Sequence, residues 1–371
     1  KRRYIKSLMH PLKKTGCCLL EVQNRSYRPA ISDLQVLSHF FINAYSVDSE
    51  RHGEERWRLR LRSLWMRWVV ITHQRFQRQM CIRDRYTYDK ERIEIVHAEE
   101  VIGFDEPPVM AVRKKKDSSI VVGMKLVKKG EADAFVSAGS TGAILVGGQM
   151  IVGRIKGIER APLAPLIPTA KGPALLIDCG ANVDARASHL VQFAQMGSIY
   201  MKHVVGVDNP KVAIVNIGAE EEKGNQLVKE TYPLLKECKD INFTGSIEAR
   251  DIPKGDADVI VCEAFVGNVI LKLYEGLAGT LLSKVKQGLM STLRSKIGAL
   301  LIKPALKKTM KEFNTDDHGG APLLGLRGLV VKTHGSSNAK DVKMGILQCV
   351  QFTEEQINEK IKENLAVKQE D

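Results

Sequence analysis

The fold of this chain is decided by the stretch Ala134-Phe135-Val136-Ser137-Ala138-Gly139-Ser140-Thr141-Gly142-Ala143. Its apolar start fits a buried strand, and the apolar residues that follow Ala143 keep a helical period. A Gly/Ser/Thr turn between a strand and a helix leaves main-chain N–H groups that favour an anion, as does the helix dipole. The turn therefore predicts a phosphate site made of Ser137, Gly139, Ser140, Thr141 and Gly142. The alternative is an ordinary turn with serine as helix N-cap, and neither a Walker loop nor a dinucleotide fingerprint is present.

From Ile93 onwards, the chain alternates short apolar strands with helices. We expect strands at 93–97, 134–136, 174–177, 212–215, 259–261 and 329–331, and helices at 118–130, 187–204 and 223–238. Prolines 162, 165 and 168 exclude regular structure from Arg160 to Pro165. Apolar strands separated by helices predict an α/β fold with a mainly parallel sheet that helices cover on both faces.

Polar, glycine-rich motifs follow five of these strands. They are Ser137–Gly142, Asp178–Asn182, Asn216–Gly218, Glu263–Asn268 and His334–Asn338. Ligands of open α/β sheets bind outside the carboxyl ends of the strands. We therefore expect the five motifs to share one cleft.

The net charge of +13 looks at first like a nucleic-acid signal. Residues 1–85 alone hold 18 Lys/Arg and 7 Asp/Glu, which leaves 38 and 36 for the rest of the chain. The body is therefore nearly neutral, and we expect it to bind no nucleic acid. The basic, Trp-containing stretch around Trp57 and Trp68 could bind nucleic acid or anionic lipid. We instead interpret residues 1–92 as sequence that is not native or as a disordered segment, and assign it no function.

The seven cysteines show no metal-binding spacing, which fits a reducing cytosol. The apolar run Val69–Ile71 is too short to span a bilayer, and no cleavable signal peptide is visible. We expect a cytoplasmic protein that is soluble or peripherally attached to a membrane.

Several motifs together resemble the bacterial phosphate acyltransferase of phospholipid synthesis. They are 132–143, Asp178–Asn182, Phe265–Asn268, Gly319–Gly325 and His334–Ser337. That family moves a fatty acyl group from acyl carrier protein to inorganic phosphate, and the acyl phosphate then serves a glycerol-3-phosphate acyltransferase. The resemblance covers residues 93–366. It implies a three-layer α/β/α sandwich like that of the isocitrate and isopropylmalate dehydrogenases, a homodimer, and no metal or organic cofactor.

One part of the family pattern is missing. The family opens with a strand leading into an Ala-Met-Gly-Gly-Asp loop, and nothing in residues 1–92 matches it. We therefore assign residues 93–371 to the acyltransferase domain without its first strand. An inactive, truncated relative is an alternative reading.

Acyl transfer from a thioester to phosphate suggests a role for each strand-end residue. Phosphate is partly dianionic at neutral pH, so the protein mainly positions it and stabilises the oxyanion. Asn182 and Asn268 are candidate amide donors, and His318 and His334 are candidates to protonate or orient the leaving thiol. Asp178 is expected to orient main-chain N–H groups. A nucleophilic role for Cys179 is the less favoured reading.

Residues 289–313 predict a helical tip that touches a membrane. Between Gly276 and Lys311 there are eight Lys/Arg and no acidic residue. The contact residues would be Leu300, Leu301, Lys303, Lys307, Lys308 and Lys311. These lysines could instead dock the acidic acyl carrier protein, and the helices could instead pack on their own core or on a dimer partner.

Three other function classes remain open. A dehydrogenase of the same general fold would need a dinucleotide fingerprint, which is not visible. A phosphotransacetylase-like enzyme would prefer acyl-CoA to a carrier protein. A basic binding protein would rest only on residues 1–85.

Overall fold

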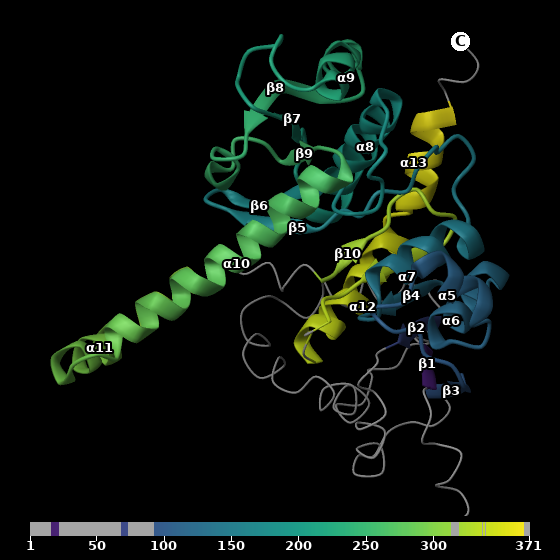
Figure 1. The fold of residues 1–371 in the computed structure, drawn as a ribbon, viewed down its shortest axis with the longest axis horizontal. Helices are drawn as coiled ribbons and strands as arrows, with labels where there is room; N and C mark the ends of the chain where they lie inside the picture. The colour runs from purple at the N-terminus through teal and green to yellow at the C-terminus, as the bar shows by residue number, and fades with distance from the viewer. Residues whose placement is uncertain are drawn as a thin grey trace, which may run out of the picture. The chain divides into compact units, whose positions relative to one another are not determined.

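The computed structural model of this protein describes residues 16–21, 68–72, 93–312, 319–335, 337 and 339–366. The chain forms two compact units, whose elements are labelled in Figure 1. The first comprises Lys1–Ala161 and Asp316–Asp371, and the second comprises Pro162–Thr315. Each unit has its own sheet.

The sheet of the first unit has, within the described residues, six strands in the order β10-β11-β4-β2-β1-β3. Their bounds are β1 Gly16–Glu21, β2 Trp68–Thr72, β3 Ile93–His97, β4 Ala134–Ser137, β10 Ala321–Pro322 and β11 Leu329–Lys332. β4 lies between β2 and β11, is parallel to both, and is buried along its whole length. An unbroken apolar run suits this position, because helices cover both faces of a parallel strand.

The described helices of the first unit are α5 Pro108–Lys114, α6 Ser119–Lys129, α7 Thr141–Gly147, α12 Ala339–Glu354 and α13 Ile357–Ala366, with a π-helical turn η2 Gly148–Val152 after α7. Among them, α6 has ends that match the signals visible in the sequence. α6 follows Ser118 and ends at Gly130, whose φ of 72° is left-handed. Its buried residues Ile120, Met124 and Val127 recur with a helical period, as expected.

The second unit is built on another sheet, with five described strands in the order β5-β6-β9-β7-β8. The bounds are β5 Leu166–Thr169, β6 Gly172–Ile177, β7 Lys211–Asn216, β8 Asn242–Glu248 and β9 Val259–Val261. β6, β9, β7 and β8 are parallel neighbours, and β5 is antiparallel to β6. The core includes Leu176, Ala213 and Ile260 from three of these strands.

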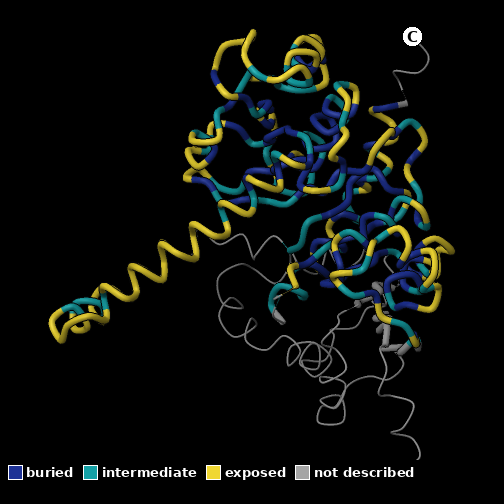
Figure 2. Tube along the Cα trace, viewed as in Figure 1, coloured by how far each residue is buried: buried dark blue, intermediate teal, exposed yellow. Residues whose placement is uncertain are grey.

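The described helices of the second unit are α8 Ala187–Tyr200, α9 Gln226–Glu237, α10 Ala264–Leu289 and α11 Leu293–Glu312, with short turns η3 Met201–Val205 and η4 Ile252–Lys254. α10 changes character along its length. Ala264, Gly267 and Ile270 are buried, whereas residues 275–288 are all exposed (Figure 2). Within the described chain, α10 alone is long and apolar enough to cross a membrane, but its first turns belong to the core of a folded unit.

The α/β class with mainly parallel strands is confirmed, and so are the six predicted strands and three predicted helices. The sheets and strands also differ from the prediction in several ways. The strands lie in two sheets, although the sequence suggested one. β5 begins directly after Pro165 and contains Pro168, which an edge strand tolerates. β1 and β2 lie within residues 1–92, where no element was assigned.

Candidate active site

The Ser137–Gly142 turn joins β4 to α7 in the first unit. The hydroxyl oxygen of Ser137 accepts from the Gly139 N–H at 3.1 Å, and that of Ser140 accepts from the Ala143 N–H at 3.5 Å. Both serines are buried, whereas Thr141 is exposed. The main-chain N–H groups of Ser140, Thr141 and Gly142 donate to no other described residue, and the first turn of α7 carries no acidic side chain. The turn is therefore capped by serine, as in the alternative reading, and still offers donors to an anion.

His334 lies at the same sheet edge as this turn. β11 pairs with β4 so that Lys332 is opposite Ser137, and the Thr333 N–H donates to the Ser137 carbonyl at 2.9 Å. His334 follows immediately and is exposed. His318, the other predicted histidine, lies outside the described residues. Of the two histidines, the structure places one, and it lies beside the turn.

Asp178 follows β6 in the second unit and is fully buried. One carboxylate oxygen accepts from the N–H groups of Leu163 and Ala181, at 2.9 and 3.2 Å. The other oxygen accepts from the N–H and the side-chain amide of Asn182, at 2.8 and 2.7 Å. Burial raises the pKa of Asp178 to about 6, and these hydrogen bonds oppose the rise. The side chain holds the 178–182 loop together, which fits its expected orienting role.

The start of α10 lies against this loop. The Ala264 N–H donates to the Asn182 carbonyl at 3.3 Å, and a side chain at Gly267 would clash with the Asp178 carbonyl oxygen. Only glycine allows so close an approach. Asn268, the residue after Gly267, is exposed, and a Cβ at Gly180 would lie 3.9 Å from its side chain. The structure therefore brings the predicted residues Asn182 and Asn268 to one end of the second sheet.

Glu263, the first residue of the Glu263–Asn268 motif, had no role of its own predicted from the sequence. Its carboxylate caps α10 by accepting from the N–H groups of Phe265 and Val266, at 2.6 and 2.8 Å. An acidic residue directly before a helix is the signal that could have identified the cap.

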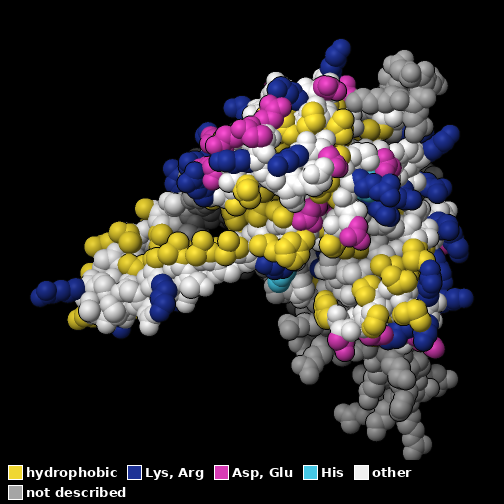
Figure 3. Space-filling model, turned by 45° about the horizontal axis from the view of Figure 1, so that its top comes forward, with side chains coloured by type: hydrophobic (Ala, Val, Ile, Leu, Met, Phe, Trp, Pro, Cys, Tyr) yellow, Lys and Arg dark blue, Asp and Glu magenta, His cyan; other side chains and the backbone are white. Residues whose placement is uncertain are grey.

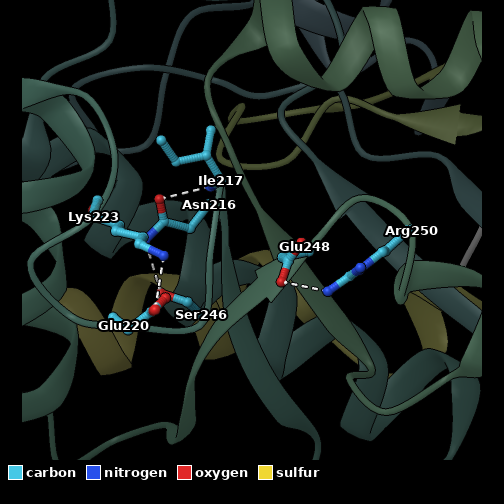
Figure 4. A network of polar contacts seen from close by, with 7 residues as sticks. All are labelled: Asn216, Ile217, Glu220, Lys223, Ser246, Glu248 and Arg250. Carbon is cyan, nitrogen blue, oxygen red and sulfur yellow. Dashed lines mark hydrogen bonds and ion pairs between the residues drawn. The ribbon is translucent and has the colours of Figure 1, made fainter.

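The Asn216–Gly218 motif has a structural role in the second unit (Figure 4). The Asn216 amide donates to the Ser246 hydroxyl and to the Lys223 carbonyl, each at 3.1 Å, and its oxygen accepts from the Ile217 N–H at 2.8 Å. Asn216 thereby ties the loop after β7 to β8.

The placing of all five strand-end motifs in one cleft stays a prediction. Within the first unit, the structure does bring the Ser137 turn and His334 together.

Cys179 is 2% exposed, and burial raises its pKa well above the ordinary value, with the neighbouring Cys262 acting in the same direction. A thiol in this position stays protonated and is shielded from a substrate. In the described part of the chain, no group of three His, Cys, Asp or Glu side chains could hold a metal ion.

The predicted contact residues of the tip lie on α11. Leu300 and Leu301 are 69% and 76% exposed, and Lys303 and Lys308 are exposed as well. The side chains of Lys307 and Lys311 lie outside the description. On α10, Leu273, Leu277 and Leu281 are spaced by four residues, and each is at least 60% exposed. Figure 3 shows a line of hydrophobic side chains along this helix.

Comparisons with known proteins give a consistent result. A family model described as "Fatty acid synthesis protein" matches residues 68–360. The chain is 51% identical to the phosphate acyltransferase of Alkaliphilus oremlandii over 76% of this chain and 84% of the relative. It is 52% identical to the phosphate acyltransferase of Clostridium perfringens over the same shares. Among solved structures, a phosphotransacetylase from Streptococcus pyogenes aligns with a TM-score of 0.50 and 18% identity over 76% of this chain and 85% of that one, a likeness of fold.

Proposed function

Because this chain belongs to the fatty acid synthesis protein family, we propose that it is an acyltransferase that moves a fatty acyl group to inorganic phosphate. The observation that carries this proposal is the 51% identity to a phosphate acyltransferase over three quarters of the chain. The acyl donor is acyl carrier protein. The acyl phosphate product serves a downstream glycerol-3-phosphate acyltransferase in phospholipid synthesis.

The Ser137–Gly142 turn binds the phosphate. Its N–H groups at 140–142 have no partner among the described residues, and no acidic side chain in the first turn of α7 competes with an anion. The exposed Thr141 hydroxyl adds a donor. A phosphate oxygen attacks the thioester carbonyl, a C–O bond forms as the C–S bond breaks, and the thiolate takes a proton. Holding the nucleophile in place contributes several kcal/mol, by the general effect of positioning.

The remaining predicted residues act on the carbonyl oxygen and on the leaving thiol. Asn268 is exposed and can donate to an oxyanion, whereas the Asn182 amide already donates to Asp178. Of the two amides, Asn268 is thus the better supported oxyanion donor. His334, at the edge that holds the turn, orients or protonates the thiol, and His318 shares this role.

Product formation from different donors tests the proposal. The full chain, with phosphate and without added metal, should convert acyl carrier protein thioesters to acyl phosphate, as detected by hydroxamate formation. A phosphotransacetylase-like enzyme would use only acyl-CoA, and that outcome would contradict the carrier-protein donor. A chimera that begins with the N-terminal segment of the Clostridium perfringens relative serves as control. Activity of the chimera alone would identify the chain as an inactive, truncated relative.

The protein works in the cytoplasm and attaches peripherally to anionic membrane through α11. Exposed Leu300 and Leu301 next to exposed Lys303 support this placement, since shallow apolar insertion and attraction of about 1 kcal/mol per lysine favour reversible binding. The exposed residues Leu273, Leu277 and Leu281 form one apolar stripe along α10. This stripe supports a homodimer, because the apolar face of a helix is normally buried by packing. The lysines of α11 are also available to the acidic carrier protein.

Replacing Leu300 and Leu301 with Asp should abolish sedimentation with anionic liposomes and leave soluble activity intact. Normal sedimentation of the variant would contradict membrane attachment. A change from dimer to monomer in light scattering would instead assign these leucines to the subunit interface.

A further inference from the structure

Three apolar side chains of the first unit are exposed close to one another in sequence. Phe104 is 62% exposed, Val109 44% and Met110 48%. Phe104 belongs to the loop before α5, and the other two lie on the first turn of that helix. The neighbours Ala111 and Val112 are buried, so α5 packs through one side and presents Val109 and Met110 to solvent. We call Phe104, Val109 and Met110 the apolar lip.

The apolar lip adjoins the Ser137–Gly142 turn. A Cβ at Gly142 would lie 2.5 Å from Cγ of Pro108, so the start of α5 packs directly on the turn. A Cβ at Gly335 would lie 3.9 Å from the ring of Phe104 and 4.0 Å from the Ala138 carbonyl oxygen. Both approaches lie within one unit. The lip therefore lies next to the place assigned to phosphate.

The loop that carries Phe104 is held in a defined shape. Glu106 pairs with Lys115 at 2.6 Å, and each side chain is 31% exposed. The same Glu106 oxygen accepts from the Gly103 N–H at 2.6 Å, and the Lys115 ammonium also donates to the Val101 carbonyl at 2.7 Å. These bonds tie both sides of Phe104 to the end of α5. The exposure of Phe104 is thus built into the loop.

We propose that the apolar lip binds the hydrocarbon chain of the acyl group. This inference rests on the proposed function, because the thioester carbonyl must come within about 3–3.5 Å of the phosphate oxygen before transfer. The chain attached to that carbonyl must then leave the turn across a neighbouring surface. Exposed Phe, Val and Met side chains favour hydrocarbon, since covering them removes apolar area from water.

Binding of alkyl phosphates tests the lip without turnover. Dodecyl phosphate and butyl phosphate combine a phosphate head with a long or a short chain, and calorimetry measures their affinity for the full chain and for the double variant Phe104→Ala/Met110→Ala. We expect the variant to lose about tenfold in affinity for dodecyl phosphate and less than about twofold for butyl phosphate. Leu347→Ala on α12, which removes a 46% exposed leucine elsewhere in the same unit, is the matched control and should change neither.

The same variants should show the same dependence on chain length in kcat/KM with hexadecanoyl and butanoyl donors. An equal loss with both chain lengths would overturn the inference. It would indicate that this part of the first unit, which also carries Arg113 and Lys114 on α5, contacts the carrier protein and not the hydrocarbon chain. An unchanged affinity for dodecyl phosphate would overturn it as well. If wild type forms no acyl phosphate but binds dodecyl phosphate through the lip, the proposed function fails and the lip stands.

Discussion

Two loops in this protein follow buried strands and look alike in sequence, yet they treat a negative charge differently. The Ser137–Gly142 turn has three N–H groups without a partner among the described residues, and no acid in the helix turn that follows. In the 178–182 loop, the Asp178 carboxylate takes the N–H groups of Ala181 and Asn182. Glu263 takes those of the neighbouring helix start.

The comparison separates a loop that can accept an anion from one that already contains its own. In the second unit, the carboxylates of Asp178 and Glu263 already accept from these N–H groups, so the groups are not available to a phosphate. In the first unit, serine hydroxyls cap the turn without adding charge. This difference supports the proposal that phosphate binds at the turn, and it fits a structural role for Asp178.

The largest effect is expected from Asp178→Ala. Four hydrogen bonds from the 178–182 loop and Leu163 would lose their acceptor inside the protein. Leaving buried groups of this kind unpaired costs about 3–5 kcal/mol. Urea unfolding followed by circular dichroism measures the loss. A change below about 1 kcal/mol would show that the loop does not depend on its carboxylate.

The pH dependence of stability tests the same carboxylate. Burial raises the pKa of Asp178 from the ordinary 3.8 to about 6, so the folded chain holds this proton more tightly than the unfolded chain. Its contribution to the unfolding free energy is therefore full below about pH 4 and is lost as the pH rises through 6. A shift of two pKa units corresponds to about 3 kcal/mol.

Unfolding free energies of wild type and Asp178→Asn should be compared between pH 4 and 7. Asn stands in for the neutral acid, so the variant should lack the decline that wild type shows. A wild-type stability that instead rises through this range relative to the variant would mean that the hydrogen bonds outweigh burial.

Local signals in the sequence predicted the first of the two loops well. β4, the turn and α7 are contiguous, and the residues that indicate each element lie within a few positions of one another. The predicted strand and the serine N-cap are therefore both found in the structure. β8 was missed because it contains Gly245 and its residues are mostly half-buried, which leaves no apolar run. β5 was missed because prolines dominate that segment and only an edge position accepts them.

Tertiary contacts explain what the sequence could not predict about the second loop. The bond from Leu163 to Asp178 spans 15 residues, and the close approach at Gly267 joins segments 89 residues apart, from Asp178 to Gly267. The exposure of Phe104 likewise follows from the bonds of Glu106 and Lys115. None of these contacts has a periodic pattern that reveals it.

A smaller effect is expected from Thr141→Val at the turn. The change removes an exposed hydroxyl donor and nearly preserves shape. A lost hydrogen bond to a charged phosphate costs about 1–3 kcal/mol, so KM for phosphate should rise while KM for the acyl donor stays nearly constant. Ser140→Ala should in addition lower stability by about 1 kcal/mol, because its hydroxyl caps α7. Unchanged phosphate kinetics in Thr141→Val would remove the turn from the site.

The smallest effect is expected at Cys179, which lies in the loop that contains its own anion. If the reaction passed through an acyl-cysteine, the 178–182 loop would be the reaction centre. Its role would then not be merely structural, in contrast to the difference drawn between the two loops. The thiol is 2% exposed, and its raised pKa keeps it protonated, so it cannot attack a thioester. Cys179→Ser should therefore keep kcat within about twofold, because the hydroxyl is a similar size and no covalent step is lost. Mass spectrometry after quenching with the acyl donor should find no acyl group on Cys179. A covalent adduct, together with an inactive serine variant, would transfer the chemistry to the second unit.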